Sequence, residues 1–188
     1  GVACGGFAVK RNGTFETPLL PVEATHLKQR KESIETGNGD IFWEGELRLR
    51  QIFDSYAGDE NSEYILRHAD FDSICHARRE NYAALLNALT APLHGIQPVF
   101  PELPEASVPS HFCLYAEKRD ELQQYLADHQ IRSTVYWPVG PLVHPQPESS
   151  VQYIYDHIVS RPCDQRFSPS DMQYVAQVLR DYSENFMR

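Results

Sequence analysis

Apolar residues recur at helical spacing in four stretches of the second half of the chain. In the range 70–89, Phe71, Tyr82 and Leu85 fall on one face, while charged and polar residues crowd the opposite face. We therefore predict a long amphipathic helix over this range. The same spacing predicts three further helices, over 118–129, 149–158 and 169–185.

The last of these helices has a start signal that is readable from the sequence. Ser168 supplies a hydroxyl at the N-cap position, and Pro169 follows at the first helical position, where its missing N–H costs nothing. The carboxylate of Asp171 lies three residues after Ser168, a spacing that lets it accept from the N-cap backbone. The sequence predicts a reciprocal capping box here.

Between the helices lie short runs of strand-forming residues. They predict strands over 108–116, 131–137 and 159–163. Strands and helices that alternate over so few residues are typical of one compact α/β layer. The fold class expected from this pattern is α+β, with a small sheet covered by helices.

The first sixty or so residues show a weaker pattern. Asn12 and Gly13 lie between two short predicted strands, at 7–11 and 14–17, which is the strongest local signal for a β-hairpin. A polar helix ended by Gly37 is expected over 23–36, and a second helix with apolar residues on one face is expected over 41–56. We interpret this part as a connecting segment, with apolar side chains left exposed on the hairpin and on the second helix.

Composition and charge exclude several classes of function. The chain carries 41% hydrophobic and 23% charged residues and a net charge of −9. An acidic chain is a poor partner for nucleic acid, because phosphate backbones need a basic face. No apolar run approaches the roughly 18 residues of a membrane-spanning helix. The four cysteines are scattered without a C-x-x-C pair, which favours reduced thiols and a cytoplasmic location.

Self-contained catalytic and metal-binding motifs are absent from the sequence. It contains no nucleophile elbow, no zinc-protease signature, no P-loop and no dinucleotide fingerprint. His68 and His76 fall two turns apart on a predicted helical stretch, too far apart to ligate one ion. We therefore expect no metal site.

The segment 136–147 is the strongest candidate for binding. It places Tyr136, Trp137 and His144 in a proline-rich loop between regular elements, where binding residues concentrate. An aromatic ring and an imidazole can pack on a sugar and donate a hydrogen bond to it. The alternative is that Trp137 covers the edge of the core and His144 lies at the surface. The bare sequence favours neither reading.

Several segments follow one another in an order that resembles one enzyme family. Arg-Arg-Glu-Asn-Tyr at 78–82 resembles an R-x-N-Y-x-x-L helix, and Arg-Asp-Glu-Leu at 119–122 an R-D-x-L helix that follows a strand. Tyr-Trp-Pro at 136–138 and Asp-Gln-Arg-Phe at 164–167, with Asp-Met at 171–172, complete the series. The family is the DegT/DnrJ/EryC1/StrS group of sugar aminotransferases, fold-type-I enzymes that use pyridoxal phosphate (PLP).

The resemblance implies where the catalytic residues lie. In this family the lysine that holds PLP precedes a Gly-Gly pair that opens a strand, and Gly5 and Gly6 resemble that pair. The lysine is then expected upstream of Gly1, while Lys10 lies on the wrong side of the glycines. The acid facing the pyridine nitrogen belongs upstream as well. Because PLP chemistry needs both groups, we expect no catalytic residue, no bound PLP and no transamination in this chain alone.

The resemblance also implies a domain organisation and a substrate. Residues 1–66 would be a remnant of the large cofactor domain, and residues 67–188 the small C-terminal domain. The intact parent would use PLP to aminate a nucleotide-linked keto-sugar for surface polysaccharides or other glycans, as a homodimer in the cytoplasm. Tyr136, Trp137 and His144 would face the substrate or cofactor. The stretch 56–62, which in relatives reaches a neighbouring cofactor phosphate, here contains no arginine.

A second hypothesis remains open. The chain begins with Gly1 and not with methionine, so we expect a processed product or a piece of a longer protein. It could instead be a non-enzymatic remnant that binds a partner protein or a sugar nucleotide. The coding sequence upstream of Gly1 separates the two hypotheses.

Overall fold

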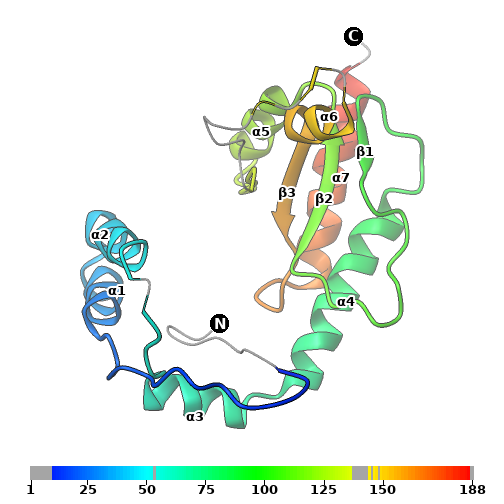
Figure 1. The fold of residues 1–188 in the computed structure, drawn as a ribbon. Coiled ribbons are helices and arrows are strands. Elements are labelled where there is room, and N and C mark those ends of the chain that lie inside the picture. Colours follow the sequence, from blue (N-terminus) through cyan, green and yellow to red (C-terminus); the bar gives the residue numbers. More distant parts are fainter. Residues whose placement is uncertain (1–9, 53, 137–143, 145, 148, 187–188) are drawn as a thin grey trace. The chain divides into compact units, whose positions relative to one another are not determined.

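The computed structural model describes residues 10–52, 54–136, 144, 146–147 and 149–186. The chain divides into two compact units, residues 1–69 and residues 70–188, which we take in turn (Figure 1).

The second unit is built on a three-stranded antiparallel sheet. Its strands are β1 (Ile96–Pro98), β2 (His111–Ala116) and β3 (Ile158–Pro162), in the spatial order β1-β2-β3. Side chains alternate along β2: Phe112 and Leu114 are buried, whereas His111 and its alternate neighbours are half-buried on the opposite face. Because Phe112 pairs with Arg161 of β3, the two side chains lie on the same face of the sheet.

Helices cover the face of the sheet that carries Phe112. They are α4 (Phe71–Ala88), α5 (Arg119–Asp128) and α7 (Pro169–Phe186), and α4 and α7 pack along each other behind the sheet (Figure 1). The ring of Phe112 lies 4.8 Å from that of Tyr82 in α4. On the opposite face, Tyr153 of α6 (Ser150–His157) contacts Tyr115 edge-on at 5.2 Å.

The predicted helices of this unit are confirmed to within a few residues at each end. The capping box at the start of α7 is also confirmed. The Asp171 carboxylate accepts from the Ser168 N–H at 2.7 Å, and the Asp171 N–H donates to the Ser168 hydroxyl at 3.3 Å. The fold class, α+β with a small helix-covered sheet, is confirmed as well.

The predicted strand over 131–137 is wrong over its described residues. Only Thr134 pairs with β3, through two backbone hydrogen bonds to Ser160 of 2.8 and 2.9 Å. The N–H of Ile131 is taken by the carbonyl of Leu126, and Gln130 adopts a positive φ of 61°. Because the backbone N–H of Ile131 is used at the end of α5, this part of the segment cannot pair with β3 as well. The three-residue strand β1 was not predicted, since it is too short to show a period.

The first unit contains three helices. They are α1 (Thr25–Thr36), α2 (Gly39–Leu49) and α3 (Glu60–His68). As predicted, α1 ends at Gly37, which caps it with a left-handed φ of 68°. Helices α1 and α2 pack together, and Arg30 of α1 pairs with Glu46 of α2.

Two expectations for the first unit need correction. The residues at 14–17 form no strand, so the described half of the predicted hairpin is absent, while residues 7–9 lie outside the described residues. The helix expected over 41–56 ends at Leu49, and the helix α3, which begins at Glu60, was not predicted. A local cap starts α3, because the Asp59 carboxylate accepts from the Ser62 N–H at 3.0 Å.

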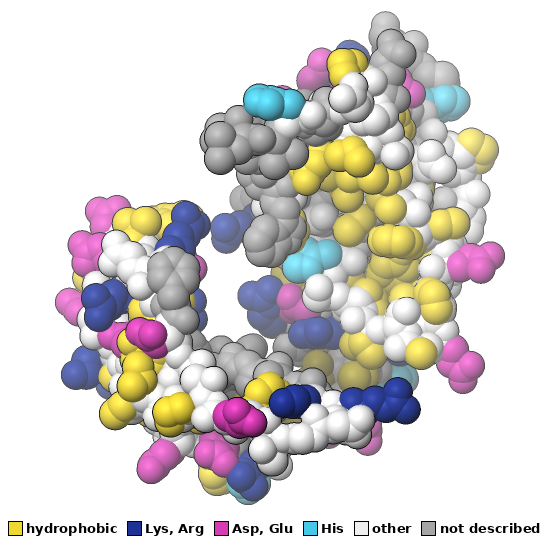
Figure 2. Space-filling model, in the orientation of Figure 1, with side chains coloured by type: hydrophobic (Ala, Val, Ile, Leu, Met, Phe, Trp, Pro, Cys, Tyr) yellow, Lys and Arg dark blue, Asp and Glu magenta, His cyan; other side chains and the backbone are white. Residues whose placement is uncertain are grey.

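Apolar side chains of α2 reach the surface, as expected. Phe42, Trp43 and Leu47 are exposed, and Figure 2 shows hydrophobic side chains at the surface of the first unit. Among the described residues, no helix is both long and apolar enough to cross a bilayer.

Candidate functional site

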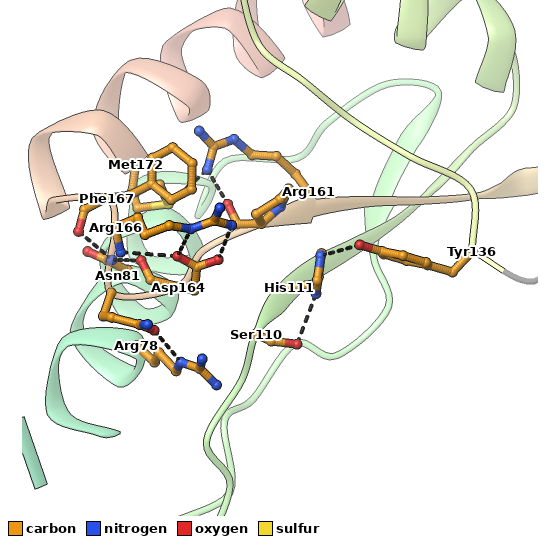
Figure 3. A network of polar contacts seen from close by, with 12 residues as sticks. Arg78, Asn81, Ser110, His111, Tyr136, Arg161, Asp164, Arg166, Phe167 and Met172 are labelled. Atoms are coloured by element: carbon orange, nitrogen blue, oxygen red, sulfur yellow. Dashed lines mark hydrogen bonds and ion pairs between the residues drawn. The ribbon is translucent and has the colours of Figure 1, made fainter. Parts of the chain in front are cut away.

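The three residues singled out from the sequence have different positions in the structure. Trp137 lies outside the described residues, and His144 is described and exposed. Tyr136 is half-exposed and its hydroxyl lies 2.9 Å from Nε2 of His111, with the two rings edge-on at 4.9 Å (Figure 3). Tyr136, one of the three predicted candidates, therefore contacts His111, the first residue of β2.

His111 links two hydroxyl groups. The Ser110 hydroxyl lies 2.9 Å from its Nδ1, opposite the contact that Tyr136 makes with Nε2. Partial burial lowers the pKa of His111, which favours the neutral ring at pH 7. A neutral imidazole has one donor and one acceptor nitrogen, so one hydroxyl accepts from it and the other donates to it.

Arg161 is a buried cation on β3. It is only 9% exposed, and its guanidinium lies 4.6 Å from the centre of the Phe167 ring. Its Nη1 donates to the Pro162 carbonyl and contacts the Met172 sulfur at 3.5 Å (Figure 3). Its buried Nε has no hydrogen-bond partner among the described residues. Burial lowers the pKa of this guanidinium, since a charge in a poorly solvated site is disfavoured.

The turn between β3 and α7 is held by a polar network. Asp164 accepts from both Nε and Nη2 of Arg166, at 2.8 and 2.6 Å, in a bidentate pair. Asn81 of α4 donates through Nδ2 to the carbonyls of Asp164 and Phe167, at 3.0 and 2.9 Å. Figure 3 shows that these contacts bring β3, the turn and α4 together.

A pocket of about 480 Å³ opens beside this turn. Its lining residues come from the segment after α5, the start of β2, the end of β3 and the turn: His111, Gln130, Arg132, Ser133, Thr134, Tyr136, Arg161, Pro162, Arg166 and Phe167. Three of these are arginines and none is a carboxylate. The pocket is therefore cationic, although the chain as a whole has a net charge of −9. Among the described residues, no group of three or more His, Cys, Asp or Glu could hold a metal ion.

The Asp164–Arg166 pair should make stability depend on pH in the acid range. The hydrogen bonds from Arg166 lower the pKa of Asp164 from 3.8 to about 2. Because the folded state binds this proton more weakly than the unfolded state, the pair stabilises the fold above about pH 4, and the stabilisation is lost as the pH falls toward 2. Since Arg166 is mostly exposed, solvent screening limits the effect to about 1 kcal/mol.

The variant Asp164→Asn tests this expectation. Its free energy of unfolding in urea should be about 1 kcal/mol below that of the unsubstituted chain near pH 7, and the difference should disappear near pH 2. Glu121→Gln, which removes an exposed carboxylate from an ion pair with Lys118, should match the unsubstituted chain throughout. A difference for Asp164→Asn that is constant with pH would contradict the assignment.

No protein-family model and no curated protein sequence matches the chain. Solved structures of aminotransferases share its fold. The aminotransferase TlmJ from Streptoalloteichus hindustanus matches with a TM-score of 0.57 at 18% identity, over 71% of this chain and 38% of its own. Spr1654 from Streptococcus pneumoniae, assigned as a sugar aminotransferase and solved in its PLP form, matches with a TM-score of 0.56 at 15% identity, over 71% and 38%.

The same fold occurs in the family that the sequence motifs resemble. A DegT DnrJ EryC1 StrS aminotransferase from Brucella abortus matches with a TM-score of 0.52 at 21% identity, over 70% of this chain and 38% of its own. The resemblance to these enzymes is confirmed at the level of the fold. The chain spans 38% of the length of each of these three proteins.

Sequence reasoning missed most residues of the pocket. His111 and Arg161 were assigned only to strands, and Arg166 only to a motif. A signal was nevertheless present for His111, because strand alternation places it on the face opposite the buried Phe112. No comparable signal exists for Arg132, which joins the pocket only through the path of the chain after α5.

Proposed function

We propose that the chain is the C-terminal part of a PLP-dependent aminotransferase that transfers an amino group to a nucleotide-linked keto-sugar for surface polysaccharides or other glycans. The observation that carries the proposal is the match in fold to sugar aminotransferases, over 70–71% of this chain but only 38% of theirs. The order of family motifs along the same chain supports it independently.

The described residues do not by themselves fit PLP. The cofactor needs a lysine amine for its aldehyde and a carboxylate for its ring nitrogen, and it then supplies an electron sink. The lysines of the chain are Lys10, Lys28, Lys31 and Lys118, and none lines the cationic pocket. No acid lines that pocket among the described residues, and the carboxylate of Asp164 in the adjoining turn is bound to Arg166. We therefore derive no catalytic step from this chain and propose that the lysine lies upstream of Gly1.

In the proposed protein, this chain contributes to substrate binding and assembly. Tyr136, Trp137 and His144 are proposed to face the substrate or the cofactor. The protein is proposed to work as a cytoplasmic homodimer, with residues 1–66 belonging to the large domain and residues 67–188 forming the small domain.

The coding sequence upstream of Gly1 is the first test. The proposal expects an in-frame extension of a domain's length, with a lysine within about ten residues of Gly1. The longer protein should bind PLP, and borohydride reduction should leave a reduced cofactor on it that dialysis does not remove. It should also aminate a nucleotide-linked keto-sugar with glutamate. The 188-residue chain alone should show neither.

Two substitutions in the longer protein sharpen the result. Replacing the upstream lysine with alanine should abolish retention of the reduced cofactor, because no Schiff base can form. Lys10→Ala should leave it unchanged, since the amine of Lys10 bonds to the Thr14 carbonyl. A start codon beside Gly1, or a cofactor attached through Lys10, would overturn the proposal. The first outcome would favour a non-enzymatic binding remnant.

A further inference from the structure

A second pocket, of about 370 Å³, lies beside the end of β2, whereas the cationic pocket lies at its start. Its lining comes from the segment between α4 and β1, from β1, from the end of β2 and from α6, which packs against β2 (Figure 1). Its described lining residues include two tyrosines and one carboxylate but no Lys, Arg or His. We propose that this tyrosine pocket, named for Tyr115 and Tyr153, binds the alkylammonium group of a small organic cation.

The two tyrosines form an edge-to-face pair. The ring centres of Tyr115 and Tyr153 are 5.2 Å apart and their planes meet at 64°. His157 stacks on Tyr153 at 4.2 Å and covers one of its faces. Whichever tyrosine presents its edge to the other, these two contacts leave at least one tyrosine face uncovered. An aromatic face carries negative potential and attracts a cation, so an ammonium group can lie over that face.

Glu117 supplies a full negative charge on the same side of the sheet. Its N–H donates to the Gly95 carbonyl at 2.9 Å, which continues the pairing of β1 with β2 by one residue. Because side chains alternate along a strand, Tyr115 and Glu117 point to the same face of the sheet. Gln97 is paired with Tyr115 and lies on that face as well. The carboxylate of Glu117 is therefore placed beside the tyrosine rings.

The carboxylate of Glu117 has no cation of the chain to balance it. It is exposed and forms no ion pair with any described residue. The neighbouring Lys118 pairs instead with Glu121, at 3.2 Å. The next residue, Arg119, pairs with Asp120 at 3.0 Å. A cationic ligand would complement this charge, in a chain whose net charge is −9.

The rest of the lining suits the carbon atoms of such a ligand. Pro92, Leu93 and Pro98 contribute apolar surface to the pocket. The volume of about 370 Å³ lies at the low end of the roughly 300–1,000 Å³ that small-molecule sites have. Aromatic rings, a carboxylate and apolar walls together favour an ammonium group with methyl or methylene groups attached to it, since each part of that group then has a matching surface.

Titration of the 188-residue chain, followed by nuclear magnetic resonance of its backbone amides, tests the proposal. Choline and ethanolamine are the cationic probes, and 3,3-dimethylbutanol is the uncharged counterpart of choline with the same shape. Ionic strength is held constant with sodium chloride. We expect saturable shifts of the Gly95 and Glu117 amides, with choline binding about tenfold more tightly than dimethylbutanol. Tighter binding of choline than of ethanolamine would identify a quaternary ammonium ligand, and the reverse a primary amine.

Substitutions of the two rings connect the binding to the pocket. Tyr115→Leu and Tyr153→Leu each remove one ring, and we expect at least one of them to weaken choline binding by about fivefold. The corresponding variants Tyr115→Phe and Tyr153→Phe should bind choline as the unsubstituted chain does, because the ring face is kept. Tyr174→Leu, which removes an exposed tyrosine of α7 outside the pocket, should have no effect.

Substitution of the carboxylate is the second arm. Glu117→Gln should weaken choline binding by about threefold while leaving the binding of dimethylbutanol unchanged, because only the charge is lost. Glu102→Gln changes the net charge equally at an exposed carboxylate of the same unit outside the pocket, and should bind choline normally.

Four outcomes would overturn the proposal. The first is the absence of saturable shifts with both choline and ethanolamine. The second is equal binding of choline and dimethylbutanol, which would make the pocket merely apolar. The third is equal weakening by Glu117→Gln and Glu102→Gln, since the attraction would then be a general effect of charge. The fourth is unchanged binding in both leucine variants of the pocket tyrosines.

Discussion

Replacing Asn81 with leucine is expected to lower the free energy of unfolding of the second unit by about 3 kcal/mol. Asn81 is 1% exposed and donates through Nδ2 to two carbonyls of the β3–α7 turn, those of Asp164 and Phe167. Leucine has the same branched shape but is larger and has no donor, so both carbonyls lose their partner in a site that water does not reach. Loss of the donor therefore weighs more than the gain in apolar surface.

Amide hydrogen exchange of α7 measures this effect in the second unit by itself. Asn87→Leu is the matched control, because Asn87 lies on the same helix and is exposed. Its effect should stay within about 0.5 kcal/mol. If Asn81→Leu changed protection as little as the control, the turn would be held by its own Asp164–Arg166 pair, and the role assigned to Asn81 would be wrong.

Replacing Phe112 with alanine is expected to lower the free energy of unfolding of the second unit by about 4 kcal/mol, because it leaves a cavity in the core. Phe112 is 1% exposed and sits on the face of β2 that α4 and α7 cover. Its ring contacts Tyr82 at 4.8 Å, so the substitution also removes an aromatic pair. Urea unfolding followed by circular dichroism should show an earlier transition for the second unit.

Phe100→Ala is the control for this cavity. The Phe100 side chain is 59% exposed, and its contact with Tyr82 runs through its backbone carbonyl, which the substitution retains. We expect a change within about 0.5 kcal/mol. Equal effects of the two substitutions would show that the packing around Phe112 is loose, contrary to the structure.

The helices of the second unit were predictable because their signals are local. The apolar face of α4 repeats within each turn, and the start of α7 is specified by Ser168, Pro169 and Asp171, which are close in sequence. The left-handed cap at Gly37 is a signal of the same kind. Each depends on backbone geometry over three or four residues, which the sequence shows directly.

The sheet was less predictable because pairing is not local. Residues 131–136 have strand-forming character, yet Gln130 and Ile131 close the end of α5 and leave one bridge to β3. The strand β1 forms because Ile96–Pro98 pair with residues of β2. Its three residues are too few to show a strand pattern in the sequence. Competition for backbone hydrogen bonds between elements decided both outcomes.

By itself, then, the sequence determined the α+β class, the helices of the second unit and a resemblance to sugar aminotransferases, which the fold confirms. Only the tertiary structure revealed the cationic pocket. Its arginines lie far apart in the sequence, on the segment after α5, on β3 and on the turn before α7. The buried state of Arg161 follows from its register opposite Phe112, which no spacing along the chain encodes. Local patterns set the elements, and their pairing across the sheet set the site.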